Sequence, residues 1–240
     1  YALKVRVRFS KFGPARFLGH LDTMRYFQKA VRRAGIPIAF SDGFRPHMIM
    51  SFAAPLGVGI TSDAEYFDME LSEKDTAPTT SEEMIRQFNA VMAEGFRVIS
   101  VRKLPEGKKY NAMSLTAAAD YQIGFSGTGY PENWAEQMEY FSSQPSILAE
   151  KKTKKGMKTT DIKRGIYSIQ AEPNGYSLRL AASSSNYVKP KMVMEAFAAY
   201  LGIDFAFYDY TVHKMEVYAN EGNEEAPRFV PLEELGENIG

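Results

Sequence analysis

The alternation of apolar and polar residues predicts a strand near the start of the chain. Residues 3–10 read LKVRVRFS, with an apolar side chain at every second position. Successive side chains of a strand point to opposite faces, so this pattern predicts a half-buried strand whose open face carries Lys4, Arg6 and Arg8. A turn is predicted over residues 11–14, at a Phe-Gly-Pro sequence.

Two stretches of the first half have the spacing of amphipathic helices. Residues 20–34 carry apolar side chains at intervals of three and four, and Gly35 predicts the helix end. A second helix is predicted over residues 80–93, because Thr80 or Ser81 can open it and two glutamates suit its first turn. Further strands are predicted at residues 36–40, 48–53, 64–71 and 96–103.

The second half repeats this order of elements. The predicted helices are residues 132–142 and 190–201, and the predicted strands are residues 115–126, 147–150, 166–171, 176–182 and 206–218. The fold class is therefore α+β, with two tandem ferredoxin-like (βαββαβ) units at residues 1–104 and 114–218. Residues 219–240 are acidic and are expected to form a loosely held tail. A single sheet through both halves is the alternative.

The composition excludes several classes of protein. The 240-residue chain has no cysteine, which excludes disulfides, thiol nucleophiles and cysteine-held metal clusters. Three histidines leave little for a transition-metal site, and no cofactor is expected. There is no apolar run of about 18 residues that would span a membrane. We expect the protein to act in the cytoplasm.

The formal net charge is zero, but the charges are segregated along the chain. Residues 1–55 hold ten basic and two acidic residues, a balance of +8, whereas residues 56–100 hold three basic and nine acidic residues. Such asymmetry indicates charged partners or charged faces rather than a fold.

The basic N-terminal part is the first candidate binding surface. Its cations could follow a phosphate backbone, and the aromatic residues among them could stack on unpaired bases. The alternative is a solvated face paired with the acidic segment 63–75. The candidate residues here are Arg6, Arg8, Lys11, Arg16, His20, Arg25, Lys29 and Arg32.

Two further segments are candidates for ligand contact. The first is the loop at residues 41–47, where glycine and proline punctuate a run of polar side chains. The second is the lysine-rich segment 151–158, expected to be a cationic finger against RNA or a solvated loop. The candidate residues are Ser41, Asp42, Phe44, Arg45 and His47 in the loop, and Lys152, Lys154 and Lys155 in the finger.

The histidines are the candidates for acid–base chemistry. His20 or His47 could exchange protons near neutral pH, since imidazole titrates there, but a structural role is favoured for His20. Their spacing lacks the pattern of a metal site.

The motifs RVRFSKFGPARFLGHLD, RRAGIP and SDGFRPHMIMSFAAPLGVGITSDAEYFDMEL resemble the radical-SAM-linked protein family. Proteins of that family are bacterial and are fused to a radical-SAM domain or act as its separate partner. The resemblance covers residues 3–103 strongly; the chain has Gly19 where the family often has Ser, and Arg45 where it often has Asn. Because the chain lacks the cysteines that hold a radical-SAM cluster, the resemblance implies the accessory partner.

We therefore expect an RNA- or partner-binding module that acts with a radical-SAM enzyme and has no chemistry of its own. An RNA-processing or RNA-modifying enzyme that uses His20 or His47 is the alternative from another class. A domain that binds only protein is a third interpretation.

Overall fold

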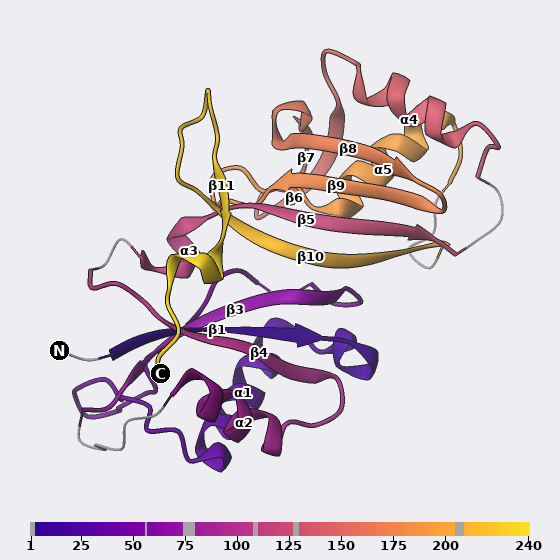
Figure 1. The fold of residues 1–240 in the computed structure, drawn as a ribbon. Helices are drawn as coiled ribbons and strands as arrows, with labels where there is room; N and C mark the ends of the chain where they lie inside the picture. The colour runs from indigo at the N-terminus through magenta and orange to yellow at the C-terminus, as the bar shows by residue number, and fades with distance from the viewer. Residues whose placement is uncertain (1–2, 56, 74–79, 108–109, 127–129, 205–208) are drawn as a thin grey trace. The chain divides into compact units, whose positions relative to one another are not determined.

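A computed structural model describes residues 3–55, 57–73, 80–107, 110–126, 130–204 and 209–240 (Figure 1). The chain divides into two compact units, which are Tyr1–Ala117 with Glu216–Gly240 (unit 1) and Ala118–Met215 (unit 2). Unit 1 takes in the C-terminal segment, which the sequence pattern places outside both halves.

Unit 1 is an antiparallel sheet with two helices against it (Figure 1). Its strands run in the order β4-β1-β3, and β2 pairs with β3. Its elements in chain order are β1 (Leu3–Lys11), the 3₁₀ helix η1 (Gly13–Phe17), α1 (His20–Ala34), β2 (Met50–Phe52), β3 (Thr61–Leu71), α2 (Ser81–Val91), β4 (Phe96–Lys103) and α3 (Ala112–Leu115).

The core of unit 1 lies between this sheet and the two helices. Val5, Val7 and Phe9 of β1 are completely buried, as their alternation with polar residues predicts. The Phe9 ring lies 4.3 Å from the Phe27 ring of α1 and 5.9 Å from the Phe67 ring of β3, measured between centroids. The apolar stripe of α1 thus packs on the apolar face of the sheet.

Both helix predictions in unit 1 are confirmed. α1 ends at Gly35, whose φ of 70° is the left-handed conformation that favours glycine. α2 is capped by Thr80, whose hydroxyl accepts a 3.1 Å hydrogen bond from the Glu83 amide.

Unit 2 is a second antiparallel arrangement of strands with two helices. Strands β10, β5, β9 and β8 are neighbours in that order, and β6 and β7 form a separate hairpin. Its elements are β5 (Thr116–Phe125), α4 (Trp134–Ser142), β6 (Leu148–Thr153), β7 (Gly156–Asp161), η3 (Lys163–Gly165), β8 (Ile166–Glu172), β9 (Gly175–Ala181), α5 (Pro190–Leu201) and β10 (Tyr210–Asn220). The first two residues of β5 and the last five of β10, from Glu216 on, belong to unit 1. The protein is thus mixed α+β, as predicted.

The C-terminal segment corrects the expectation of a loosely held tail at residues 219–240. It contains β11 (Phe229–Pro231), which pairs with the end of β10, and the 3₁₀ helix η5 (Leu232–Leu235). Leu232 is completely buried, and the Ile239 amide donates a 2.8 Å hydrogen bond to the Ser81 hydroxyl. Charge composition suggested a solvated tail, whereas a few apolar residues and backbone pairing hold it to unit 1.

Across the described part of the chain, no helix is both long enough and apolar enough to cross a membrane.

Candidate functional site

The open face of β1 is neutralised by acidic side chains of the neighbouring strand. Lys4 lies opposite Glu70 and Arg6 opposite Asp68 in the β1–β3 register. The Lys4 ammonium is 3.5 Å from a Glu70 carboxylate oxygen, and Arg6 Nε is 2.8 Å from Asp68 Oδ1. At Lys4 and Arg6 this face therefore matches the alternative in which the basic segment pairs with the acidic segment 63–75.

The prediction that Arg6 contacts nucleic acid is wrong, because Arg6 is only 1% exposed. Its guanidinium donates two hydrogen bonds to Asp68, of 2.8 and 3.0 Å. It donates two more to backbone carbonyls, at 2.9 Å to Leu232 and at 2.6 Å to Tyr110. Arg6 thus joins β3, the segment after β4 and the C-terminal segment.

Arg8 is likewise held by acidic groups of unit 1. Its guanidinium lies 3.1 Å from a Glu216 carboxylate oxygen and 2.7 Å from one of Glu233. Glu216 also accepts a 2.7 Å hydrogen bond from the Tyr66 hydroxyl. Burial raises the pKa of Glu216, and burial together with the Glu216 charge raises that of Tyr66. The prediction that Arg8 contacts a phosphate is therefore wrong, because Arg8 pairs with the carboxylates of Glu216 and Glu233 within the protein.

Lys11 and Arg16 are involved in local structure. Lys11 is 1% exposed, and its ammonium donates to the carbonyls of Leu18 at 2.8 Å and Gly57 at 3.2 Å. Arg16 is half-buried; its guanidinium donates to the Gly13 carbonyl and lies 4.5 Å from the Phe17 ring centroid. The prediction that Lys11 contacts a phosphate is wrong, because its charge is enclosed by backbone carbonyls.

The basic side chains of α1 are exposed. Arg25, Lys29 and Arg32 recur at intervals of four and three, so they lie along one side of the helix, away from the buried Phe27. Arg25 forms one ion pair, 3.6 Å from Asp22, and both side chains of that pair are well exposed. The outer face of α1 therefore carries an accessible basic stripe, which we call the α1 stripe (Arg25, Lys29 and Arg32).

The loop at residues 41–47 is closed at its base and exposed at its tip. The Ser41 amide donates to the His47 carbonyl at 2.8 Å, the His47 amide donates to the Ser41 hydroxyl at 3.1 Å, and that hydroxyl lies 2.9 Å from His47 Nδ1. Phe44 is fully exposed at 106%, and its neighbours Asp42 and Arg45 are exposed too. Ser41 and His47 thus form a clasp that presents Phe44 and Arg45.

His20 has partners of its own, separate from those of His47. Its ring packs edge-on against Phe52, with 5.7 Å between the ring centroids. Its Nδ1 atom is shielded from solvent and has no hydrogen-bond partner among the residues that the structure describes. This placement favours packing at the start of α1 over acid–base chemistry with His47.

The lysine-rich segment is a β-hairpin with an ordered turn. Lys151 lies directly opposite Lys158 in the β6–β7 register, and Lys154 and Lys155 form the turn. The turn is closed by a 2.8 Å hydrogen bond from the Thr153 hydroxyl to the carbonyl of Gly156, whose φ is 116°. Lys152, Lys154 and Lys155 are all exposed. The predicted cationic finger is therefore present.

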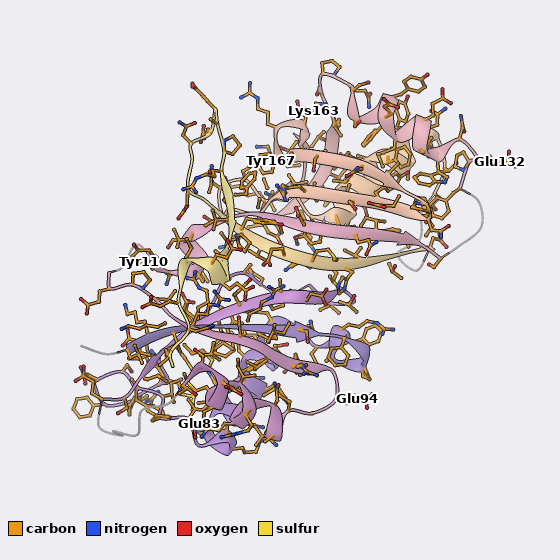
Figure 2. All side chains as sticks on the ribbon, in the orientation of Figure 1. Glu83, Glu94, Tyr110, Glu132, Lys163 and Tyr167 are labelled. Atoms are coloured by element: carbon orange, nitrogen blue, oxygen red, sulfur yellow. The ribbon has the colours of Figure 1, made fainter. Side chains whose placement is uncertain are left out.

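The base of this hairpin is anchored by Asp161. Its carboxylate accepts 3.0 Å hydrogen bonds from the amides of Ile147 and Lys163, and these bonds lower the pKa of the carboxyl group. Lys163, labelled in Figure 2, donates to the Ser142 carbonyl. The finger thus extends from a fixed base.

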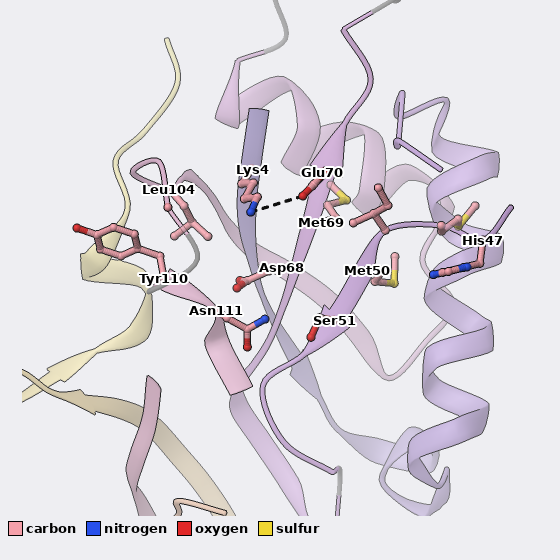
Figure 3. Close-up of a pocket in the computed structure, with 13 residues that line it drawn as sticks. Lys4, His47, Met50, Ser51, Asp68, Met69, Glu70, Leu104, Tyr110 and Asn111 are labelled. Carbon is pink, nitrogen blue, oxygen red and sulfur yellow. Dashed lines mark ion pairs between the residues drawn. The ribbon is translucent and has the colours of Figure 1, made fainter. Parts of the chain in front are cut away.

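Sequence reasoning missed a pocket in unit 1, beside β2 and β3 (Figure 3). Its volume is about 380 Å³, within the range of small-ligand sites. Lys4, Ser51, Asp68, Glu70 and Asn111 contribute polar groups to its lining. The alternation of residues 49–52 shows which side chains share a face, but not that Leu104 and Asn111 border the same pocket.

The described residues contain no group of three or more histidine, aspartate or glutamate side chains arranged to hold a metal ion. Fold and site together define a mixed α+β protein with an exposed aromatic loop, exposed groups of basic side chains and a small pocket beside β2 and β3.

The chain belongs to the family described as "Uncharacterized protein conserved in bacteria (DUF2344)", which matches residues 4–190. No curated protein matches the chain.

Proposed function

We propose that the protein is an RNA-binding accessory module that acts with a radical-SAM enzyme and catalyses no reaction itself. The observation that carries this proposal is the tip of the loop at residues 41–47, where Phe44 is fully exposed beside Arg45. Aromatic rings and guanidinium groups presented in this way are the groups on which proteins stack unpaired RNA bases.

The structure of the loop favours a binding role for its tip. An exposed phenylalanine forgoes the stabilisation of about 1.5–3 kcal/mol that burial of the side chain provides. The Ser41–His47 clasp limits the conformations of the loop, so ordering the tip on binding costs less entropy. A ring that is held in water and whose loop is preorganised is available to a partner.

In this proposal the RNA phosphates bind to the α1 stripe and to Lys152, Lys154 and Lys155 of the β6–β7 hairpin. These cations are exposed, whereas those of β1 are paired internally. Lys151 and Lys158 face each other across the hairpin, an arrangement that repels and that a bound polyanion would relieve. The proposal assigns RNA backbone binding to these two groups.

The radical-SAM partner in this proposal comes from the resemblance of the N-terminal motifs. A second protein would supply the chemistry, which is consistent with a chain that has no cysteine. The closure of the Ser41–His47 pair favours a structural role for His47 over the enzymatic alternative.

Strand order supports the tandem ferredoxin-like interpretation of the fold. In unit 1 the helix-linked strands β1, β2, β3 and β4 lie in the order β4-β1-β3-β2. In unit 2 the order β10-β5-β9-β8 follows the same scheme, with the β6–β7 hairpin inserted after α4. We propose two ferredoxin-like units, of which the second carries the finger as an insertion.

The test is fluorescence anisotropy with a labelled single-stranded RNA of mixed sequence. We expect Phe44→Ala to weaken binding by about 1–3 kcal/mol, or roughly 5- to 150-fold, because one base loses its stacking partner. The triple variant Arg25→Gln/Lys29→Gln/Arg32→Gln should reduce the slope of log K against log salt concentration by roughly 2. Each lost phosphate contact on a single strand accounts for about 0.7 of that slope.

Arg86→Gln is the matched control, since Arg86 is an exposed arginine on α2 whose weak ion pair with Glu83 is exposed too. The proposal predicts wild-type affinity for this variant. Absence of salt-dependent RNA binding by the wild-type protein, even at about 50 mM salt, would refute it. Co-elution with a radical-SAM enzyme in that case would assign the loop to a protein partner instead.

A further inference from the structure

The pocket of unit 1 is not used by the RNA contacts proposed above, although it adjoins them. His47 contributes to its lining and also belongs to the clasp that presents Phe44. Figure 3 shows Ser51, Asp68 and Asn111 around the same part of the pocket. A ligand in the pocket would therefore lie next to the base of the loop.

The charges around the pocket cancel. Asp68 forms a bidentate ion pair with Arg6, and Glu70 lies 3.5 Å from the ammonium of Lys4. An ion such as a free phosphate or a dicarboxylate would have to break one of these pairs. The pocket therefore suits an uncharged ligand.

The polar groups of the pocket offer both hydrogen-bond donors and acceptors. The Ser51 hydroxyl and the Asn111 amide nitrogen form no hydrogen bond within the described part of the chain, while Asn111 Oδ1 accepts from the amide and the hydroxyl of Ser114. Ser51 can donate or accept, the amide nitrogen of Asn111 donates, and Glu70 accepts. A matching ligand carries amino and carbonyl groups on one edge.

The rest of the lining is mainly apolar. Ile49 and Leu104 contribute apolar surface. Apolar surface with a few polar groups is the usual composition of a small-molecule site. The volume of about 380 Å³ is sufficient for one base with part of its ribose.

We propose that this pocket binds a single unpaired nucleobase. The base would belong to the RNA strand whose neighbouring base stacks on Phe44, so the inference rests on the proposed function. Recognition would use the amino and carbonyl edge of the base against Ser51 and Asn111, while its phosphates stay outside the neutral pocket.

The experiment uses the full chain labelled with ¹³C at its methionine methyl groups. Met50 lies in the lining, so its methyl resonance, assigned with Met50→Leu, reports on a ring bound there. The probes are guanosine and cytidine, whose bases carry both an amino and a carbonyl group, with ribose 5-phosphate and inorganic phosphate as probes that lack a base. We expect at least one nucleoside to shift the Met50 resonance, and neither phosphate to do so.

Two variants locate the ligand. Ser51→Phe fills the pocket and should abolish the shift, whereas Ser168→Phe, at an exposed serine of β8, should leave it unchanged. Asn111→Ser keeps a residue suited to capping α3 but removes the amide donor, and should weaken nucleoside binding about tenfold. Circular dichroism checks that each variant folds. If Ser51→Phe does not fold, the nucleoside affinity of Asn111→Ser tests the pocket instead.

The outcomes separate the two proposals. If RNA binding depends on Phe44, but no nucleoside shifts Met50 and Ser51→Phe keeps full RNA affinity, the pocket inference is overturned and the proposed function stands. If nucleosides bind and Ser51→Phe abolishes this, but RNA does not bind, the ligand class is supported and the RNA function is overturned. A shift by phosphate alone overturns the inference.

Discussion

Replacing Arg6 with methionine is the sharpest test of how unit 1 is held together. Methionine approximates the length of the side chain but removes every donor. The change breaks the contacts of Arg6 with Asp68 and with the carbonyls of Leu232 and Tyr110. Asp68 then keeps, among the described residues, a 2.9 Å hydrogen bond from the Ala112 amide.

The magnitude follows from the burial of the pair. Removing one partner of a buried ion pair costs about 3–5 kcal/mol, since the other charge stays behind without compensation. The Asp68 side chain retains 13% exposure, so we take the lower part of that range, about 3–4 kcal/mol. For a chain of this size the corresponding fall in Tm is roughly 6–16 °C.

The assay combines thermal and urea unfolding, followed by circular dichroism, with hydrogen exchange of residues 229–235. Arg6→Met should lower the free energy of unfolding and speed exchange in this segment, which Arg6 holds through Leu232. Arg25→Met is the control, because its ion pair with Asp22 is exposed and contributes at most about 1 kcal/mol.

The double variant Arg6→Met/Asp68→Met should be destabilised by less than the sum of the single changes, since no charge is left unpaired. An Arg6→Met protein whose stability lies within about 0.5 kcal/mol of wild type would refute the assignment of Arg6 as an internal ion pair.

Two further predictions concern unit 1. Burial raises the folded-state pKa of Glu216, so the contribution of this side chain to stability is complete below the unfolded pKa near 4.5 and is lost as pH rises through the folded pKa. Urea unfolding at several pH values should therefore show wild type losing stability relative to Glu216→Gln over that rise. A stability difference that does not depend on pH would contradict this. Gly95→Ala should lower the Tm more than Gly35→Ala. Both glycines have positive φ, but a Cβ at Gly95 would lie 2.5 Å from the Ala15 Cβ, whereas a Cβ at Gly35 meets no atom within 4 Å. Equal losses of stability would contradict this clash.

Local patterns predicted α1, α2, β1, β3 and β4 well, because period and capping are properties of neighbouring residues. The strand predicted at residues 36–40 is wrong, since only isolated bridges form there, at Ile38 and Phe40. The alternation in LKVRVRFS placed Val5, Val7 and Phe9 in the core, and the stripe and terminal Gly35 bounded α1. The lysine hairpin was foreseen only in part, since a finger was expected at residues 151–158 but no strand was predicted at Gly156–Asp161.

What covers an open face could not be predicted in the same way. Alternation shows that Arg6 and Arg8 share a face, but their partners are 62 and more than 200 residues away in the sequence: Asp68 for Arg6, and Glu216 and Glu233 for Arg8. The same limit explains the C-terminal segment, whose acidic composition suggested solvation. It also explains the pocket, which Ser51 and Asn111 form only after long-range folding.

The most direct measurement for the proposed function is the RNA affinity of a substitution series at Phe44. Fluorescence anisotropy at fixed low salt would compare wild type with Phe44→Trp, Phe44→Leu and Phe44→Ala. Base stacking requires a ring, so Trp should match or exceed wild type, whereas Leu and Ala should both bind RNA more weakly, by roughly 5- to 150-fold. If all four proteins bind RNA equally, or if Leu binds as tightly as wild type, Phe44 does not stack on RNA and the proposed function is wrong.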